Sequence, residues 1–163
     1  MAGVAIYRTG IAADWIDYNG HLRDAYYGLI ISYATDALME RIGLDAAYRK
    51  SSGCTLYTLE MHIHYLREVK GTDSAVVTVR VLAADHKRIH AAFELGIEAS
   101  PDAAQPETVA TAEVMLLHVQ QQPVVVSKVF PPAISAAIAA LMQAGAQAPP
   151  GIPGSRRMQL PQR

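Results

Sequence analysis

The segment that decides the fold reads Asp17-Tyr18-Asn19-Gly20-His21-Leu22-Arg23-Asp24-Ala25-Tyr26-Tyr27, and it leads directly into a long apolar stretch. Apolar side chains then share one wide face at helical spacing: Tyr27, Ile30, Ile31, Ala34, Ala37, Leu38 and Ile42. Ser32, Asp36 and Glu40 form the narrow opposite stripe. The pattern predicts a helix over about 24–42, with Asp24 as its N-cap and Gly43 at its end. So wide an apolar face indicates a helix that the rest of the chain largely encloses.

Strand-like segments lie on both sides of this helix in the sequence. One precedes it, over about 4–9, and a short second helix over about 44–50 follows it. Four further strands are predicted over 54–69, 74–84, 88–100 and 108–120. Short turn signals separate these four, which favours an antiparallel meander. This element order belongs to the α+β class, and a single enclosed helix needs a sheet that curls around it.

The chain has 163 residues, which suits one domain and is too short for two enzymatic domains. We expect that domain to cover residues 1–145, closed by an Ala-rich helix over about 132–144, and residues 146–163 to form a Pro-rich tail. Lys and Arg number 14 against 15 Asp and Glu, so no basic field for nucleic acid is present. We expect no membrane span and no secretory signal. The single cysteine, Cys54, cannot form an intramolecular disulfide and is expected to pack as a small side chain, which favours a cytoplasmic protein.

The loop before the helix gathers groups that can do chemistry. Asp17 supplies a carboxylate, Asn19 an amide and His21 an imidazole, beside a helix start with free N–H groups and partial positive charge. A carbonyl placed there would be polarised, and a carboxylate can attack it or activate water. Gly20 would let the backbone approach a ligand closely. The alternative interpretation is structural: Asp17 and Asn19 build turns and cap the helix, while His21 packs.

The segment from Asp17 to Leu22, followed by Asp24-Ala25-Tyr26-Tyr27 and a long helix, resembles the hot-dog-fold acyl-CoA thioesterases of the 4-hydroxybenzoyl-CoA thioesterase type. The resemblance covers about residues 4–120 and continues in the segment from Tyr65 to Asp73. Four segments, 36–45, 58–63, 85–90 and 112–119, are similar to the thioesterases of carnitine breakdown. The resemblance implies hydrolysis of an acyl-CoA, most closely of betainyl-CoA to glycine betaine and CoA.

The resemblance also implies roles for residues of the site. Asp17 would be the catalytic carboxylate, and the thioester carbonyl would lie at the backbone N–H groups around Asp24, Tyr26 and Tyr27. Asn19 and His21 would shape the loop or contact substrate or water. CoA would be part of the substrate, so no separate cofactor is expected, and the protein would be a homodimer or homotetramer. Open alternatives are a thioesterase for another short or aromatic acyl-CoA, a non-catalytic acyl-CoA-binding protein and a dehydratase of the same fold.

A trimethylammonium group cannot donate hydrogen bonds, and proteins bind it on aromatic faces. The chain has eight Tyr and one Trp but only two Phe. The aromatic residues in the loop, at the helix start or on the long strand are Trp15, Tyr18, Tyr26, Tyr27, Tyr57 and Tyr65. Some of these are expected to form the cation site, and the alternative is that they pack in the core or at an interface.

Charged residues outside the loop are further candidates. Arg67, Lys87 and Arg88 are expected to bind the CoA phosphates, or else to be solvated turn charges. Glu60 and His62 share a strand face and are candidates to reach the substrate from the neighbouring strand. His62 and His64 have a spacing that suits a metal, but no third ligand is evident, so no metal is predicted.

Overall fold

A computed structural model describes residues 3–71, 74–98 and 106–146 of the chain. In chain order the elements are β1 (Val4–Gly10), the 3-10 turn η1 (Ala13–Trp15), α1 (Asp24–Ile42), α2 (Ala46–Ser52), β2 (Cys54–Tyr65), β3 (Ser74–Ala84), β4 (Arg88–Glu98), β5 (Glu107–Gln120), β6 (Val126–Ser127) and α3 (Pro132–Gly145). Of the predicted tail, all but Ala146 lies outside the described residues. No helix in the described part of the chain is long and apolar enough to cross a membrane.

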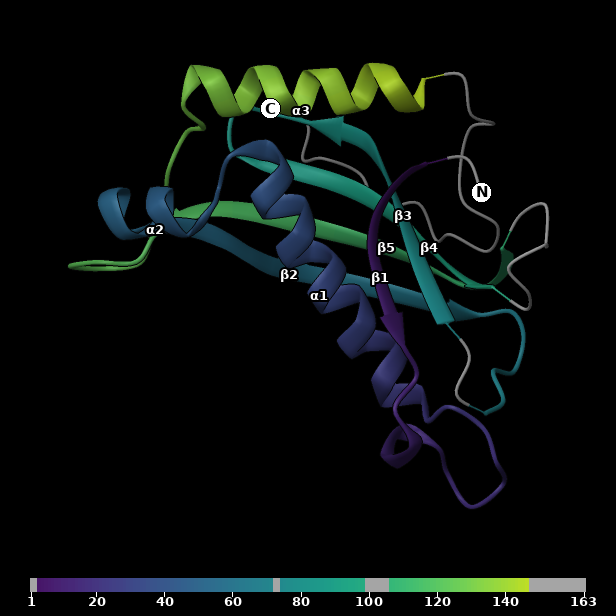
Figure 1. Ribbon diagram of the computed structural model, residues 1–163. Coiled ribbons are helices and arrows are strands. Elements are labelled where there is room, and N and C mark those ends of the chain that lie inside the picture. The colour runs from purple at the N-terminus through teal and green to yellow at the C-terminus, as the bar shows by residue number, and fades with distance from the viewer. Residues whose placement is uncertain (1–2, 72–73, 99–105, 147–163) are drawn as a thin grey trace.

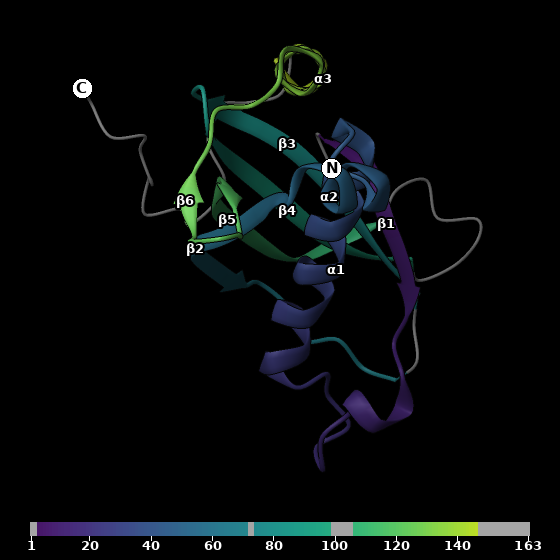
Figure 2. The ribbon, with the colours of Figure 1, turned by 90° about the vertical axis from the view of Figure 1, so that its left-hand side faces the viewer.

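One antiparallel sheet curls around α1, as Figures 1 and 2 show. The strand order is β1-β3-β4-β5-β2, and the short β6 pairs with the end of β5. Helix α3 lies along one end of the sheet, against β3 (Figure 1). The predicted α+β arrangement of a curved sheet around one long helix is therefore confirmed.

The core lies between α1 and the concave face of the sheet. The buried residues of α1 are Tyr27, Ile30, Ile31, Ala34, Thr35, Leu38, Met39 and Ile42. Alternate residues of β4, such as Ile89, Phe93 and Leu95, face them and are fully buried. The predicted polar stripe of α1 is exposed, which confirms the expected orientation of the helix.

The predicted meander holds for β3, β4 and β5 but is wrong for β2. β2 pairs with β5 and forms one edge of the sheet, while β1 pairs with β3 and forms the other. The reason is the path of the chain after β2. The Leu66 and Arg67 N–H groups both donate to the Val109 carbonyl oxygen, at 2.9 and 3.1 Å, which ends the ladder. The predicted strand over 54–69 therefore stops at Tyr65.

The long helix has its predicted ends, but its predicted N-cap is wrong. Arg23 occupies the N-cap position without a side-chain hydrogen bond, and Asp24 is the first helical residue. An acidic side chain in the first turn still faces the positive end of the helix. Gly43 ends α1 in a left-handed conformation, as predicted. The second helix begins two residues later than predicted, because Asp45 caps it by accepting the Tyr48 N–H at 2.7 Å.

Candidate active site

Residues 17–21 form a tight turn that fixes the Asp17 carboxylate. The Gly20 N–H donates to the Asp17 carbonyl oxygen at 3.0 Å, and Gly20 is left-handed with a φ of 79°. Asp17 Oδ1 accepts the N–H groups of Asn19 at 2.8 Å and of His21 at 3.0 Å. The Asp17 N–H donates to the His21 carbonyl oxygen at 2.8 Å. The motif therefore builds a turn, as its residue types predict, and the Asp17 side chain is part of that turn.

The turn leaves the second oxygen of Asp17 available. Both N–H groups bind Oδ1, and within the described residues no hydrogen bond reaches Oδ2. The His21 N–H is the largest cause of a lowered pKa at Asp17; burial opposes it, and the Asn19 N–H and the nearby charges of His21 and Arg23 add to it. The carboxylate is ionised at neutral pH, which is the form that attacks a carbonyl or takes a proton from water.

Helix α1 begins at the same place and offers a hydrogen-bond donor. The Tyr26 N–H donates to the Arg23 carbonyl oxygen at 3.0 Å, and the Ala25 N–H donates to Asp24 Oδ1 at 2.8 Å. The Asp24 N–H has no acceptor among the described residues. The helix dipole adds partial positive charge at this end. A carbonyl oxygen beside Asp24 can accept this free N–H.

Asp17 and Asp24 line one pocket of about 370 Å³. Its other lining residues are His21, Leu22, Tyr27, Tyr65, Leu66, Arg67 and Glu68. The segment after β2 is fastened to the loop: the Leu22 N–H donates to the Val69 carbonyl oxygen at 2.9 Å, and His21 Nε2 lies 3.2 Å from a Glu68 carboxylate oxygen. Two segments far apart in the sequence therefore form opposite walls of the pocket.

Of the predicted residues in the loop and the first turn of α1, Asp17, His21, Asp24 and Tyr27 line this pocket. Asn19 and Gly20 lie in the turn, and Tyr18 projects from it with 93% of its surface exposed. Trp15 and Tyr26 stack on each other outside the pocket, with ring centroids 5.1 Å apart and an angle of 13° between the rings, and both pack against the core.

Tyr57, Glu60 and His62 lie on β2 outside the pocket. Side chains alternate along a strand, and Met61 and Ile63 pack against the core on the α1 side. Glu60 and His62 therefore face the other side of the sheet, where His62 Nε2 lies 2.8 Å from Glu60 Oε1. Within one chain the structure does not bring these side chains to Asp17.

The predicted CoA-binding residues divide between the two ends of the sheet. Arg67 lines the pocket and pairs with Glu107 at 2.8 Å. Lys87 lies in the turn before β4 and Arg88 is the first residue of β4, at the other end of the sheet. Arg88 is level with Leu117 of β5, whereas Tyr65 is level with Ala110, so about seven residues, or roughly 23 Å of strand, separate the two ends.

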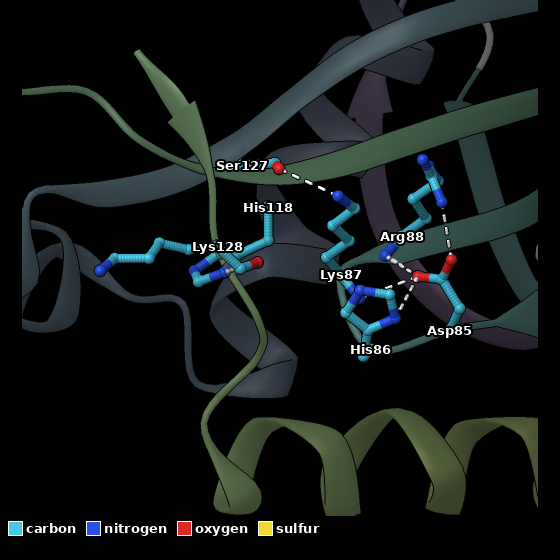
Figure 3. Close-up of polar contacts among 7 residues, drawn as sticks. All are labelled: Asp85, His86, Lys87, Arg88, His118, Ser127 and Lys128. Carbon is cyan, nitrogen blue, oxygen red and sulfur yellow. Dashed lines mark hydrogen bonds and ion pairs between the residues drawn. The ribbon is translucent and has the colours of Figure 1, made fainter. Parts of the chain in front are cut away.

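The turn containing Lys87 and Arg88 is held by Asp85 (Figure 3). Asp85 Oδ1 accepts the N–H groups of Lys87 and Arg88, at 2.8 and 2.7 Å, and Oδ2 accepts Arg88 Nη1 at 2.8 Å. Burial by itself raises the pKa of Asp85, but these donors and the Arg88 charge together lower it. Lys87 Nζ donates to Ser127 Oγ at 3.0 Å. The turn thus holds Lys87 and Arg88 in fixed positions, with the Arg88 guanidinium paired to Asp85.

A family model, the thioesterase-like superfamily, matches residues 11–138 of the chain. The chain belongs to this superfamily. Its membership of this superfamily identifies it as a thioester hydrolase. A betainyl-CoA thioesterase of Pseudomonas aeruginosa is 48% identical over 113 residues, which cover 69% of this chain and 68% of that protein.

Two solved structures share the fold over nearly the whole chain. A proposed thioesterase from Pseudomonas putida is 42% identical, with a TM-score of 0.79 and coverage of 99% of both chains. A Staphylococcus aureus protein in complex with CoA is 27% identical, with a TM-score of 0.81 and coverage of 99% of this chain and 98% of that one. The predicted hot-dog fold and the predicted relation to acyl-CoA thioesterases are confirmed.

Membership of the superfamily gives significance to pocket residues that the sequence did not single out. Leu22, Leu66 and Glu68 line the pocket but were not predicted as site residues. The sequence pointed to the segment from Tyr65 to Asp73 through its family resemblance and through the two candidates Tyr65 and Arg67, but not to Leu66 or Glu68. Among the described residues, no group of three or more His, Cys, Asp or Glu side chains is arranged to hold a metal.

Proposed function

We propose that this protein hydrolyses betainyl-CoA to glycine betaine and CoA, with Asp17 as the catalytic carboxylate. One observation carries the proposal: an ionised carboxylate with a free oxygen shares a pocket with an unpartnered N–H at a helix start. The acyl group is proposed from the relative named as a betainyl-CoA thioesterase, at 48% identity. CoA as the carrier is supported by the relative solved in complex with CoA.

The chemistry follows from these two groups. The thioester oxygen accepts the Asp24 N–H, which stabilises the negative charge that develops there. Asp17 Oδ2 either adds to the carbonyl carbon or takes a proton from the water that adds to it. On both routes the C–S bond breaks, the CoA thiolate leaves and takes up a proton, and water supplies an oxygen of the free acid. Asn19 and His21 position Asp17 through their N–H groups.

The rest of the substrate is proposed to cross onto a second copy of the chain. β2 is an edge strand; Leu59 and Tyr65 on it, and Leu66 directly after it, are 45–55% exposed. Antiparallel pairing of two β2 strands about a two-fold axis would bring the Cys54 end of one copy beside the Tyr65 end of the other.

That pairing would give the remaining predicted residues a role. Lys87 and Arg88 of one copy would approach the other copy's pocket and meet the CoA phosphates, together with Arg67. Tyr57, Glu60 and His62 would approach the same pocket across the interface. We place the reaction in the cytoplasm, because Cys54 is buried and unpaired, as cysteines in reducing compartments are.

Release of free thiol tests the proposal. Betainyl-CoA is compared with acetyl-CoA, benzoyl-CoA and a long-chain acyl-CoA, and we expect the highest kcat/KM for betainyl-CoA. Asp17→Asn should lower kcat by about 10²–10⁴-fold with an unchanged unfolding curve, because it removes the negative charge. Asp14→Asn, an exposed residue of η1, is the matched control and should retain activity.

Other results would point elsewhere. A preference for acetyl-CoA or benzoyl-CoA would favour a thioesterase for another short or aromatic acyl group. Binding of all four esters without turnover would favour a non-catalytic acyl-CoA-binding protein. Near-normal turnover by Asp17→Asn would contradict the assigned role of Asp17.

A further inference from the structure

We infer that Tyr27, Tyr65 and the Asp24 carboxylate form the site for a quaternary ammonium group, inside the pocket that Asp17 lines. The inference rests on the proposed function, because it assigns the acyl end of the same site.

In the proposed substrate, the ammonium group lies close to the thioester carbon that reacts. A betainyl group has the N–Cα–C connectivity of a glycine residue, so its nitrogen lies about 2.5 Å from the thioester carbon. Whatever binds the ammonium group must therefore share a pocket with the attacking carboxylate. Among the predicted aromatic residues only Tyr27 and Tyr65 line the pocket with Asp17.

The rings of Tyr27 and Tyr65 meet edge to face. Their centroids are 5.1 Å apart and their planes meet at 89°, so together they form a corner rather than a flat stack. Tyr27 is buried, and 53% of the surface of Tyr65 is exposed. The Tyr65 hydroxyl donates to the Asp24 carbonyl oxygen at 3.5 Å. A rounded cation with no hydrogen-bond donor suits such a corner of aromatic surface.

The charged side chains that line the pocket are mostly acidic. Three carboxylates line the pocket, those of Asp17, Asp24 and Glu68, and the one guanidinium, of Arg67, is paired with Glu107. Glu68 is shared with His21 at 3.2 Å and Lys70 at 3.6 Å.

Asp24, by contrast, has no basic partner among the described residues. Burial, as the largest cause, raises the pKa of Tyr27 and of Tyr65, so both are neutral phenols at neutral pH. Asp24 therefore supplies, beside the rings, a negative charge that no basic side chain of the described residues pairs with, and an anionic acyl group would be repelled.

The competing aromatic residues lack one of these features. Trp15 and Tyr26 cover one face of each other by stacking and do not line the pocket. Tyr18 stands in solvent, and Tyr57 is eight residues along β2 from Tyr65. Within one chain, none of these rings lines the pocket in which a group about 2.5 Å from the reacting carbon would lie.

The test compares betainyl-CoA with 3,3-dimethylbutyryl-CoA, which has the same shape with carbon in place of the nitrogen. The ammonium group itself activates the thioester, so the measurement is the change in the ratio of the two kcat/KM values between variants. Tyr65→Leu should lower the ratio about tenfold, since it removes one aromatic face, and Tyr65→Phe should keep it within about twofold. Asp24→Asn should lower it about threefold while leaving the backbone N–H in place.

Controls of the same chemistry lie elsewhere on α1. Tyr33→Leu, an exposed tyrosine that contacts Tyr7, and Asp36→Asn, an exposed carboxylate, should leave the ratio unchanged. Equal loss for both esters in Tyr65→Leu would overturn the inference, because Tyr65 would then only shape the pocket.

A binding measurement separates this inference from the proposed function. If the wild type hydrolyses neither ester, the proposed function fails, and saturation-transfer NMR then tests the cation site alone. Transfer to tetramethylammonium but not to tert-butanol, lost in Tyr65→Leu, would support the site. Equal transfer to both probes, or transfer that Tyr65→Leu does not change, would overturn it.

Discussion

Asp17 is both a turn residue and an available acid, and its two oxygens divide these roles. Oδ1 accepts two N–H groups of the turn, while Oδ2 accepts no hydrogen bond among the described residues, and Asp17 lines the pocket. The sequence offered a structural and a chemical interpretation of Asp17 as alternatives, and the geometry is compatible with both at once. Turn formation also serves chemistry, because the donors on Oδ1 keep the carboxylate ionised.

The turn requires a left-handed backbone conformation at Gly20. With a φ of 79°, any other L-residue would be strained there, although a Cβ would meet nothing within 4 Å. Gly20→Ala should therefore lower the free energy of unfolding by about 1 kcal/mol, measured by urea titration. Gly10→Ala is the matched control, since its Cβ also meets nothing and its φ is not in the left-handed region. Equal effects of the two substitutions would contradict this account.

At the level of elements, the sequence predicts what local patterns determine. The helix over 24–42 and the strand over 74–84 were predicted with the observed bounds, because apolar spacing and flanking glycine or turn residues are local signals. The strand that pairs with β2 is β5, which is far from it in the sequence, so local patterns do not reveal the pairing. No pattern within 54–69 shows that the chain leaves the sheet after Tyr65. The loop wall of the pocket was likewise predictable from Asp17 to Tyr27, whereas Glu68 joins it only through the fold.

The His118 side chain on β5 contacts both α2 and the segment before α3. It is fully buried on β5; its Nδ1–H donates to the Lys128 carbonyl oxygen at 3.0 Å (Figure 3), and its Nε2 accepts the Tyr48 hydroxyl of α2 at 3.1 Å. It also stacks on Phe130, 5.0 Å away, just before α3. Burial lowers the pKa of His118, against the opposing effect of the Lys128 and Val129 backbone. The neutral imidazole is therefore the form that holds α2, β5 and the segment before α3 together.

A pH-dependent contribution to stability follows. The unfolded chain takes up a proton at His118 near pH 6.5 and the folded chain resists it, so the contribution is complete above pH 6.5 and is lost as the pH falls below it. At pH 7.5, His118→Gln should lower the free energy of unfolding by about 1–3 kcal/mol, because buried partners lose their hydrogen bonds. The difference from the wild type should narrow at pH 5.5. A difference that stays constant or widens in acid would contradict the assignment.

The net charge of the whole chain is only −1, but the two ends of the sheet carry charged side chains that are mostly of opposite sign. The pocket at the start of α1 is lined by three carboxylates and one guanidinium. The other end of the sheet carries Lys87 and Arg88, the latter paired with Asp85, and Lys128, whose side chain points away from them (Figure 3). A substrate with a cation at its acyl end and phosphates on its carrier needs both kinds of surface, and neither end requires a strong net field. Two-fold pairing of β2 would place the acidic end of one copy beside the basic end of the other.

The proposed two-fold pairing of β2 predicts that activity depends on association. Leu59 is 55% exposed and lies at the register shift of β2, near the middle of this edge strand. In a two-fold antiparallel pair of β2 strands, the Leu59 side chains of the two copies would therefore lie close to each other. We expect light scattering to give about 35 kDa, twice 17.6 kDa, or a multiple of it, for the wild type. Leu59→Lys should shift the mass to 17.6 kDa and lower kcat/KM at least about tenfold, since like charges would face each other across the axis. Ala136→Lys, on the exposed face of α3, should change neither. A fully active wild-type monomer, or a Leu59→Lys variant with wild-type mass and activity, would show that β2 is not the interface and that one chain suffices for the site.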